Sequence, residues 1–194
     1  MESYLLIILI FIIIVYRYFA LSEVTYSNNL YNSNKKKYLV RNLSDKDEAI
    51  NTLIKIENSL KLLISKLLED KTIINSDMYK YIEKINEKID YVEIQESPID
   101  SKYTSYSVNK GELLVFCIRS KITYKIHDIN DLLYVAIHEI AHIGCPEIGH
   151  TDLFFKINKF LINKAIEYGI YKYVDYSINS REDCGINLTV SVAN

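Results

Sequence analysis

The sequence has few glycine and proline residues and no excess of basic residues. Its 194 residues include five Gly and two Pro, and 23 Lys and Arg against 25 Asp and Glu, for a net charge of −2. So little Gly and Pro excludes a collagen-like repeat, and a hydrophobic content of 49% excludes an intrinsically disordered chain. Without a basic excess, nucleic acid is not an expected partner. The length suits a single domain of ordinary size.

Cysteine is scarce as well. The chain has three, Cys117, Cys145 and Cys184, at wide spacing. An odd number at wide spacing makes a disulfide framework unexpected and favours a reducing compartment. Cys117 lies in an apolar stretch and is expected to be a small buried side chain, and Cys184 is expected to be a packed or loop thiol.

A long apolar run occupies the start of the chain. From Tyr4 to Val15 every residue is apolar or aromatic. A cleaved signal peptide needs a basic start and a small-residue cleavage site, which this stretch lacks. The run therefore predicts an uncleaved transmembrane anchor over residues 1–21, in contact with the lipid bilayer through residues 4–21. Because Lys and Arg follow the run and none precedes it, we expect a single-pass membrane protein with its N-terminus outside. Its main domain would then lie in the cytosol or inside a virion.

The remaining chain divides into a polar stretch and a domain. Residues 22–44 are rich in Ser, Asn and Tyr and are expected to form a tether. Residues 45–194 are expected to form the domain. Apolar residues at helical spacing predict amphipathic helices over 45–68 and 77–91.

Two strands are expected after these helices. The stretches 103–108 and 112–119 have strand-like composition, and Asn109-Lys110-Gly111 separates them. Gly111 can adopt the left-handed conformation that a three-residue hairpin loop requires. The second strand is almost continuously apolar, which indicates a central or well-covered position.

The candidate site lies in the sequence DLLYVAIHEIAHIG, residues 131–144. Its apolar spacing predicts a helix, which Asp128 or Asn130 can cap and Gly144 can end. His138 and His142 are one turn apart, so they project from the same face and can bind one zinc ion. Glu139 is placed to reach a metal-bound water instead of the metal, as a general base and acid requires.

A third ligand is expected close behind the helix. His150 follows His142 across the turn-rich IGCPEIG. Three protein ligands and one open position are typical of a catalytic zinc site. Glu167, on the next predicted helix from Thr151 to Gly169, is the alternative third ligand. Buried, merely hydrogen-bonded histidines and a structural zinc ion remain the other interpretations of the motif.

The motif resembles those of the minimal zincin metallopeptidases of the WLM and SprT-like kind. In these families a third His follows His-Glu-x-x-His within a pattern like Gly-His-x-x-x-Phe, which His150 and Phe154 match. The seven residues between His142 and His150 exceed the WLM gap and are fewer than in many SprT-like members. The metzincin pattern fails, because its third His would fall on Ile148. The resemblance covers about residues 100–170.

The whole chain also resembles membrane-anchored HExxH proteins of large, A/T-rich DNA viruses, through YLVRNLSDKDEA, TSYSVNKGE and REDCGI. Together the resemblances imply an α+β fold. A zincin-like domain with a small sheet and an HExxH helix would follow one N-terminal transmembrane helix. The implied function is a membrane-anchored zinc metallopeptidase with a protein or peptide substrate. The alternative is a catalytically silent structural or virion membrane protein, against which the intact Glu139 argues. A DNA–protein crosslink protease is disfavoured by the missing basic excess.

Several further side chains are candidates for supporting roles. Asp152 either orients His150 or, as we favour, interacts with the dipole of its own helix. Cys184 could bind the metal as a thiolate and silence the site. His127 is not expected to be a ligand. An oxyanion donor is sought among three tyrosines of the tail, Tyr171, Tyr173 and Tyr176.

Overall fold

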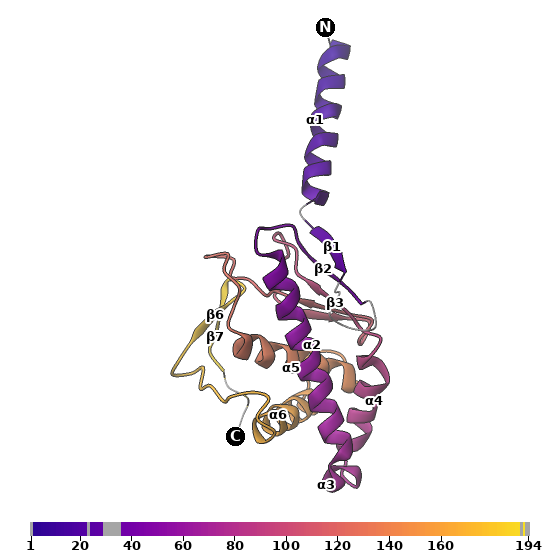
Figure 1. Ribbon diagram of the computed structural model, residues 1–194, viewed down its shortest axis with the longest axis vertical. Coiled ribbons are helices and arrows are strands. Elements are labelled where there is room, and N and C mark those ends of the chain that lie inside the picture. Colours follow the sequence, from indigo (N-terminus) through magenta and orange to yellow (C-terminus); the bar gives the residue numbers. More distant parts are fainter. Residues whose placement is uncertain (1, 23, 29–35, 191, 193–194) are drawn as a thin grey trace.

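The computed structural model describes residues 2–22, 24–28, 36–190 and 192 (Figure 1). Its fold is mixed, with helices packed against a small sheet and a separate hairpin near the C-terminus. The elements in chain order are α1 Glu2–Ser22, β1 Val24–Asn28, β2 Lys37–Arg41, α2 Lys46–Glu69, α3 Lys71–Ile74, α4 Tyr79–Ile89, β3 Glu93–Glu96, β4 Tyr106–Val108, β5 Leu113–Phe116, α5 Ile129–Gly144, α6 Asp152–Glu167, β6 Arg181–Asp183 and β7 Ile186–Leu188.

The main sheet has the strand order β1-β2-β3-β5-β4. β3 pairs in parallel with both β2 and β5, whereas β1 and β4 run antiparallel to their neighbours. The nearly continuous apolar sequence of β5 is explained by its position between β3 and β4, with Leu114 and Val115 fully buried. β4 is therefore one of the two edge strands of the described sheet, and β1 is the other.

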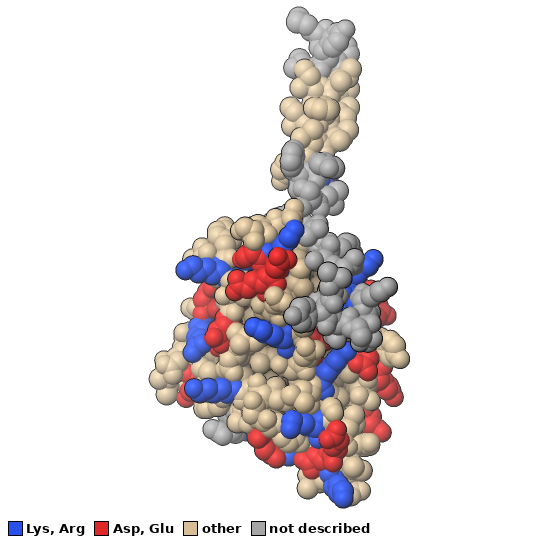
Figure 2. Space-filling view, viewed as in Figure 1, with Lys and Arg blue, Asp and Glu red and all other residues tan. Residues whose placement is uncertain are grey.

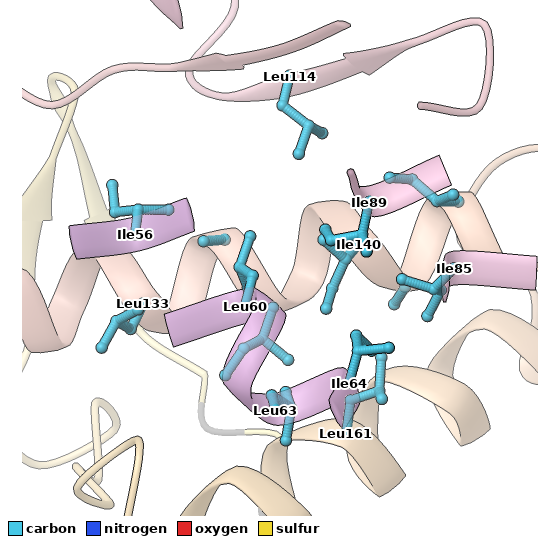
Figure 3. Close-up of a cluster of buried hydrophobic side chains, with 14 of the residues drawn as sticks. Ile56, Leu60, Leu63, Ile64, Ile85, Ile89, Leu114, Leu133, Ile140 and Leu161 are labelled. Carbon is cyan, nitrogen blue, oxygen red and sulfur yellow. The ribbon is translucent and has the colours of Figure 1, made fainter. Parts of the chain in front are cut away.

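Helix α5 is central to the packing, because it contacts α2, α4 and α6. Its last residue, Gly144, lies so close to α4 that an added Cβ would be 3.0 Å from the carbonyl oxygen of Tyr81. Figure 3 shows core side chains of these helices meeting Leu114 of β5 beneath the sheet: Ile56, Leu60, Leu63, Ile64, Ile85, Ile89, Leu133, Ile140 and Leu161. The candidate site is thus built on a helix that packs against three other helices.

The predicted transmembrane anchor over residues 1–21 is wrong. The stretch does form a helix, α1, which points away from the other elements (Figure 1). Over the described residues, however, no helix combines the length and the apolar character needed to cross a bilayer. The strictly apolar run from Tyr4 to Val15 is twelve residues, about 18 Å of helix, whereas a hydrocarbon core is about 30 Å thick. The predictions of a single-pass topology, an outside N-terminus and bilayer contact through residues 4–21 are withdrawn with it.

The predicted tether, residues 22–44, contains two strands of the main sheet. β1 pairs with β2, and β2 pairs with β3. Tyr38 and Val40 of β2 are buried in the core. The Tyr38 hydroxyl also donates a hydrogen bond of 2.5 Å to Glu57 of α2. The packed part of the chain therefore includes β2, before residue 45.

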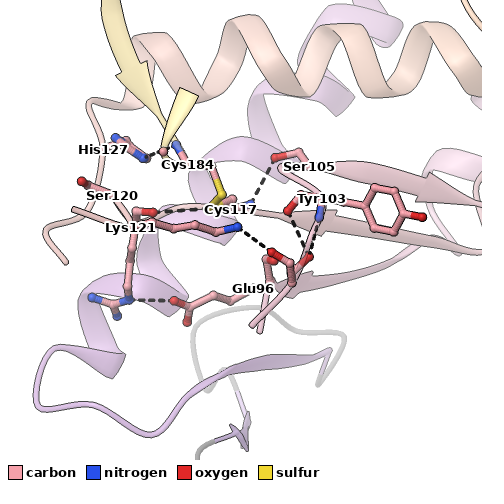
Figure 4. Close-up of a disulfide and its surroundings, with 12 residues drawn as sticks. Glu96, Tyr103, Ser105, Cys117, Ser120, Lys121, His127 and Cys184 are labelled. Atoms are coloured by element: carbon pink, nitrogen blue, oxygen red, sulfur yellow. Dashed lines mark hydrogen bonds and ion pairs between the residues drawn. A yellow bond between two sulfur atoms is a disulfide. The ribbon is translucent and has the colours of Figure 1, made fainter. Parts of the chain in front are cut away.

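The expectation of unpaired thiols is wrong for two of the three cysteines. Cys117 and Cys184 form a disulfide bond across a sequence separation of 67 residues (Figure 4), and Cys145 remains a buried free thiol. The bond joins the end of β5 to the β6–β7 hairpin. Beside it, the backbone N–H of Cys184 donates to Nε2 of His127 at 3.3 Å. The hairpin is thereby fixed to the main body.

Charges of both signs are distributed over the surface. On the face shown in Figure 2, Lys and Arg side chains lie among Asp and Glu side chains over the body below α1. The described residues of that face form no continuous basic patch. The expectation that nucleic acid is not a partner stays a prediction.

Candidate metal centre

Three histidine side chains converge at one point of the surface. Nε2 of His150 lies 2.9 Å from Nε2 of His138 and 3.2 Å from Nε2 of His142. Each residue contributes one ring nitrogen, and these three nitrogens all lie within 4.8 Å of one another. Imidazole nitrogens in this arrangement can bind a single metal ion.

The local sequence of α5 explains how two of these rings are positioned. Asp128 caps the helix by accepting the backbone N–H of Asn130 at 2.8 Å, so the helix begins where the sequence predicts. The apolar residues of α5 are buried against the other helices, which leaves His138 and His142 half-buried on the open face. Their spacing of one turn then places both rings side by side, with centroids 5.0 Å apart.

His150 reaches the same point because the chain reverses between α5 and α6. Gly149 has a φ of +83°, a backbone conformation that favours glycine. Thr151 then caps α6 by accepting the N–H of Phe154 at 3.3 Å. The Phe154 ring stacks on His142 with centroids 4.1 Å apart and lies 4.9 Å from His150. The buried ring of Phe154 thus packs against the imidazoles of His142 and His150 and helps to hold them in place.

The electrostatics of the cluster keep two imidazoles neutral at physiological pH. Burial, followed by the neighbouring His142 and His150, lowers the pKa of His138 to about 3. Burial, followed by His150 and Lys110, lowers the pKa of His142 to about 4. A neutral imidazole has a free lone pair, so these rings are in the protonation state that binds metal.

Glu139 lies beside the cluster and is almost fully buried, with 5% of its surface exposed. Burial raises the pKa of its carboxyl to about 8. The backbone of Ser107, on edge strand β4, favours the charged carboxylate and so opposes this shift. A carboxyl group with a pKa near neutrality can both accept and donate a proton.

Lys110 supports the loop that carries His150. Its Nζ donates to the backbone carbonyl oxygens of Cys145 at 2.6 Å and Glu147 at 2.5 Å. Lys110 belongs to the turn between β4 and β5, where Asn109, Lys110 and Gly111 all have positive φ, as the hairpin prediction requires at Gly111. This role could not be predicted from local sequence, because the lysine and the loop are 35 residues or more apart.

A cleft of about 990 Å³ contains the histidine cluster and Glu139. Edge strand β4 contributes Tyr106 and Ser107 to its lining, and Asp183, residues 186–190 and Val192 contribute the hairpin side. Tyr134 of α5 also lines it and donates a hydrogen bond of 2.9 Å to the carbonyl oxygen of Val190. The cleft is therefore bounded by the sheet edge and by the hairpin that the disulfide holds.

Other residues predicted for the site lie elsewhere. Glu167 is exposed and forms an ion pair of 2.9 Å with Lys164. Asp152 is exposed in the first turn of α6, as a helix-dipole partner would be. Cys184 is in the disulfide bond and not in the histidine cluster. The three tyrosines considered as oxyanion donors, Tyr171, Tyr173 and Tyr176, are absent from the described cleft lining.

Comparison with known proteins places the chain among viral proteins. No known protein-family profile matches it. It is 42% identical to the uncharacterized protein R325 of Acanthamoeba polyphaga mimivirus over 191 residues, which are 96% of each protein. The chain belongs to the R325 family. The R325-like chain is also 42% identical, over 67 residues, to the uncharacterized protein 042R of Invertebrate iridescent virus 3, covering 34% of this chain and 42% of that protein. The expected kinship with viral proteins is confirmed, and that with membrane-anchored ones is not supported.

The fold of this R325-family chain is similar to that of a solved structure. The crystal structure of a Wss1 mutant from Saccharomyces cerevisiae superposes with a TM-score of 0.50. The match covers 68% of this chain and 92% of the yeast chain at 16% identity. At this identity the likeness shows a shared fold alone.

Proposed function

We propose that this R325-family protein is a zinc-dependent metallopeptidase that hydrolyses peptide bonds. The observation that carries the proposal is the convergence of His138, His142 and His150 next to the buried Glu139 in one cleft. The fold shared with Wss1, a WLM-family zinc metalloprotease, supports it. It agrees with the resemblance of the motif to that family.

The histidine cluster fits a zinc ion. Nitrogen ligands about 2.0–2.1 Å from a tetrahedral zinc lie about 3.3 Å from one another, and the observed Nε2 separations from His150 are 2.9 and 3.2 Å. His138, His142 and His150 would hold the ion and leave its fourth position open. When bound, zinc polarises a carbonyl group and lowers the pKa of a water molecule toward 7.

Glu139 would move the proton during hydrolysis. Its carboxylate would take a proton from the attacking water and pass it to the leaving amine, as general base and then general acid. Ser107 lines the same cleft, and its backbone favours the charged form of this carboxylate.

The edge strand supports a polypeptide substrate. β4 pairs with β5 along one side and is last in the described strand order, so its other side can pair with an extended peptide. Tyr106 and Ser107 of this strand line the cleft that contains the histidines. Such pairing would bring a substrate backbone past Glu139.

The deciding experiment measures zinc content and general proteolysis in the wild type and in Glu139→Gln. We expect both proteins to bind one equivalent of zinc and the variant to lose about 10²–10⁴-fold in rate. Glu167→Gln, the same change at the exposed end of α6, is the matched control and should retain activity. Equal activity in wild type and Glu139→Gln would remove Glu139 as the base. A zinc-loaded wild type without activity on any substrate would favour a catalytically silent structural protein.

A further inference from the structure

A second carboxylate lines the cleft and has no role in the proposed chemistry. Asp183 is the last residue of β6, and 4% of its surface is exposed. It contributes to the cleft lining together with Glu139. The next residue, Cys184, is joined to Cys117, so the disulfide bond fixes the position of Asp183 relative to the sheet.

The carboxylate of Asp183 has no positive partner within the described part of the chain. No hydrogen bond or ion pair to its side chain is found there, and its electrostatic neighbours are the acidic Glu182 and Asp131. Burial, and then these two acids, raise its pKa to about 6. At neutral pH the cleft wall therefore carries a buried negative charge without compensation, which is energetically costly.

The nearby cations are already engaged. Arg181, at the other end of β6, forms an ion pair of 2.9 Å with Asp131. Lys110, the basic residue of the described cleft lining, donates to the two carbonyl oxygens of the His150 loop. The carboxylate of Asp183 is therefore available to a positive group of a ligand in the cleft.

Asp183 is also close enough to the reaction centre to affect it. Its charge contributes to the raised pKa of Glu139, so the two carboxyl groups interact through space. Asp183 does not belong to the group of metal-binding side chains, which consists of the three histidines in the described residues. A ligand group bound by Asp183 would therefore lie beside the scissile bond and not on the metal.

We propose that Asp183 is a specificity-determining residue, which accepts the positively charged side chain of a Lys or Arg next to the scissile bond of a polypeptide substrate. The inference rests on the proposed peptidase function. A buried carboxylate that gains an ion pair only when a basic side chain docks would discriminate strongly against an uncharged side chain of the same length.

The test compares peptides that differ at one position. A series of fluorogenic peptides is made in which one position flanking the cleaved bond is varied at a time. At that position one peptide carries Lys and its partner carries norleucine, an uncharged analogue of Lys. We expect wild type to prefer Lys at one position by about tenfold or more in kcat/KM. Asp183→Asn should reduce this preference to about twofold or less, while Asp183→Glu should restore part of it. Asp77→Asn, the same change at an exposed site between α3 and α4, is the control and should keep the preference.

A binding measurement separates this inference from the proposed function. Fluorescence anisotropy gives the Kd of the Lys and norleucine peptides for zinc-loaded Glu139→Gln, with and without Asp183→Asn. If wild type cleaves nothing but these proteins show the Asp183-dependent preference, the peptidase function fails, while the recognition of a basic side chain by Asp183 stands. Cleavage without a Lys preference, or a preference that Asp183→Asn leaves unchanged, overturns the inference alone. Equal Kd values for both peptides, or no binding of either, also overturn it.

Discussion

The side-chain nitrogen of Lys110 and the backbone carbonyl oxygen of Cys145 are 2.6 Å apart. This hydrogen bond joins the β4–β5 turn to the first residue after α5, and a second bond from the same nitrogen reaches Glu147. Cys145 and Glu147 belong to the loop between α5 and α6, and this loop also carries His150. The position of the third histidine therefore depends on a lysine from the sheet.

Replacing Lys110 should weaken metal binding without removing a ligand. In Lys110→Met both bonds to the loop are lost, so His150 is held less firmly, and we expect zinc affinity to fall by about tenfold. Competition with a fluorescent zinc chelator measures the change. Lys55→Met, on the exposed side of α2, is the matched control and should bind zinc like the wild type. An unchanged affinity in Lys110→Met would show that the loop holds its shape without the lysine.

His150 is predicted to be the third ligand. We expect His150→Ala to lose more than about 100-fold in zinc affinity, because one of three nitrogen ligands is removed. Glu167→Gln should bind zinc normally, since Glu167 is exposed and paired with Lys164. Metal content after dialysis against a zinc buffer reports both results. Zinc loss in Glu167→Gln together with retention in His150→Ala would reverse the assignment.

The disulfide bond should contribute strongly to stability. Cys117 and Cys184 are 67 residues apart, and closing a loop of that length lowers the entropy of the unfolded chain by an amount worth about 4 kcal/mol. We expect reduction to lower the free energy of unfolding by a similar amount, measured from urea denaturation with and without dithiothreitol. The Cys117→Ser/Cys184→Ser double variant serves as the control and should show no effect of dithiothreitol. If the wild type unfolds at the same urea concentration after its thiols are shown to be free, this contribution is absent.

The parts of the site that are local in sequence could be predicted from it. The spacing of apolar residues and the caps at Asp128 and Thr151 predict α5 and α6. Helical periodicity alone places His138 and His142 on one face, because one turn separates them. The glycine-containing turn before His150 indicated the return of the chain to the same helix. These inferences required only interactions between residues close in sequence.

The remaining features depend on contacts between distant residues. The pairing of Cys117 with Cys184 follows from the position of the β6–β7 hairpin, which no periodicity signals in its short strands. Strand β3 was missed for the same reason, since it is a strand of only four residues that pairs in parallel with β2 and β5 from elsewhere in the chain. The roles of Lys110 and Asp183 likewise appear only when the sheet edge and the hairpin face one cleft. The odd number of cysteines led to the wrong expectation of free thiols, because three cysteines can still form one disulfide bond and leave one thiol free.

The raised pKa of Glu139 predicts how the stability of the metal-free protein changes with pH. In the unfolded chain this carboxyl loses its proton near its ordinary pKa of 4.5, but in the folded protein it keeps the proton up to about pH 8. Between these values the folded state binds more protons than the unfolded state, so the free energy of unfolding falls as pH rises. Glu139→Gln has no such carboxyl. We therefore expect the variant to become more stable than the wild type between pH 4.5 and 8, by roughly 2–4 kcal/mol at the upper end.

Urea denaturation of both proteins in a chelating buffer, at several pH values, measures this difference. Protonation of His138 and His142, whose pKa values are lowered to about 3 and 4, destabilises the fold as pH falls below 6.5. This effect is present in both proteins, so it cancels in the comparison. Glu167→Gln, a change at an exposed site, is the control. Its free energy of unfolding should differ from that of the wild type by the same amount at every pH. If the difference for Glu139→Gln is also constant from pH 4.5 to 8, the carboxyl is not held protonated by its burial beside the histidines.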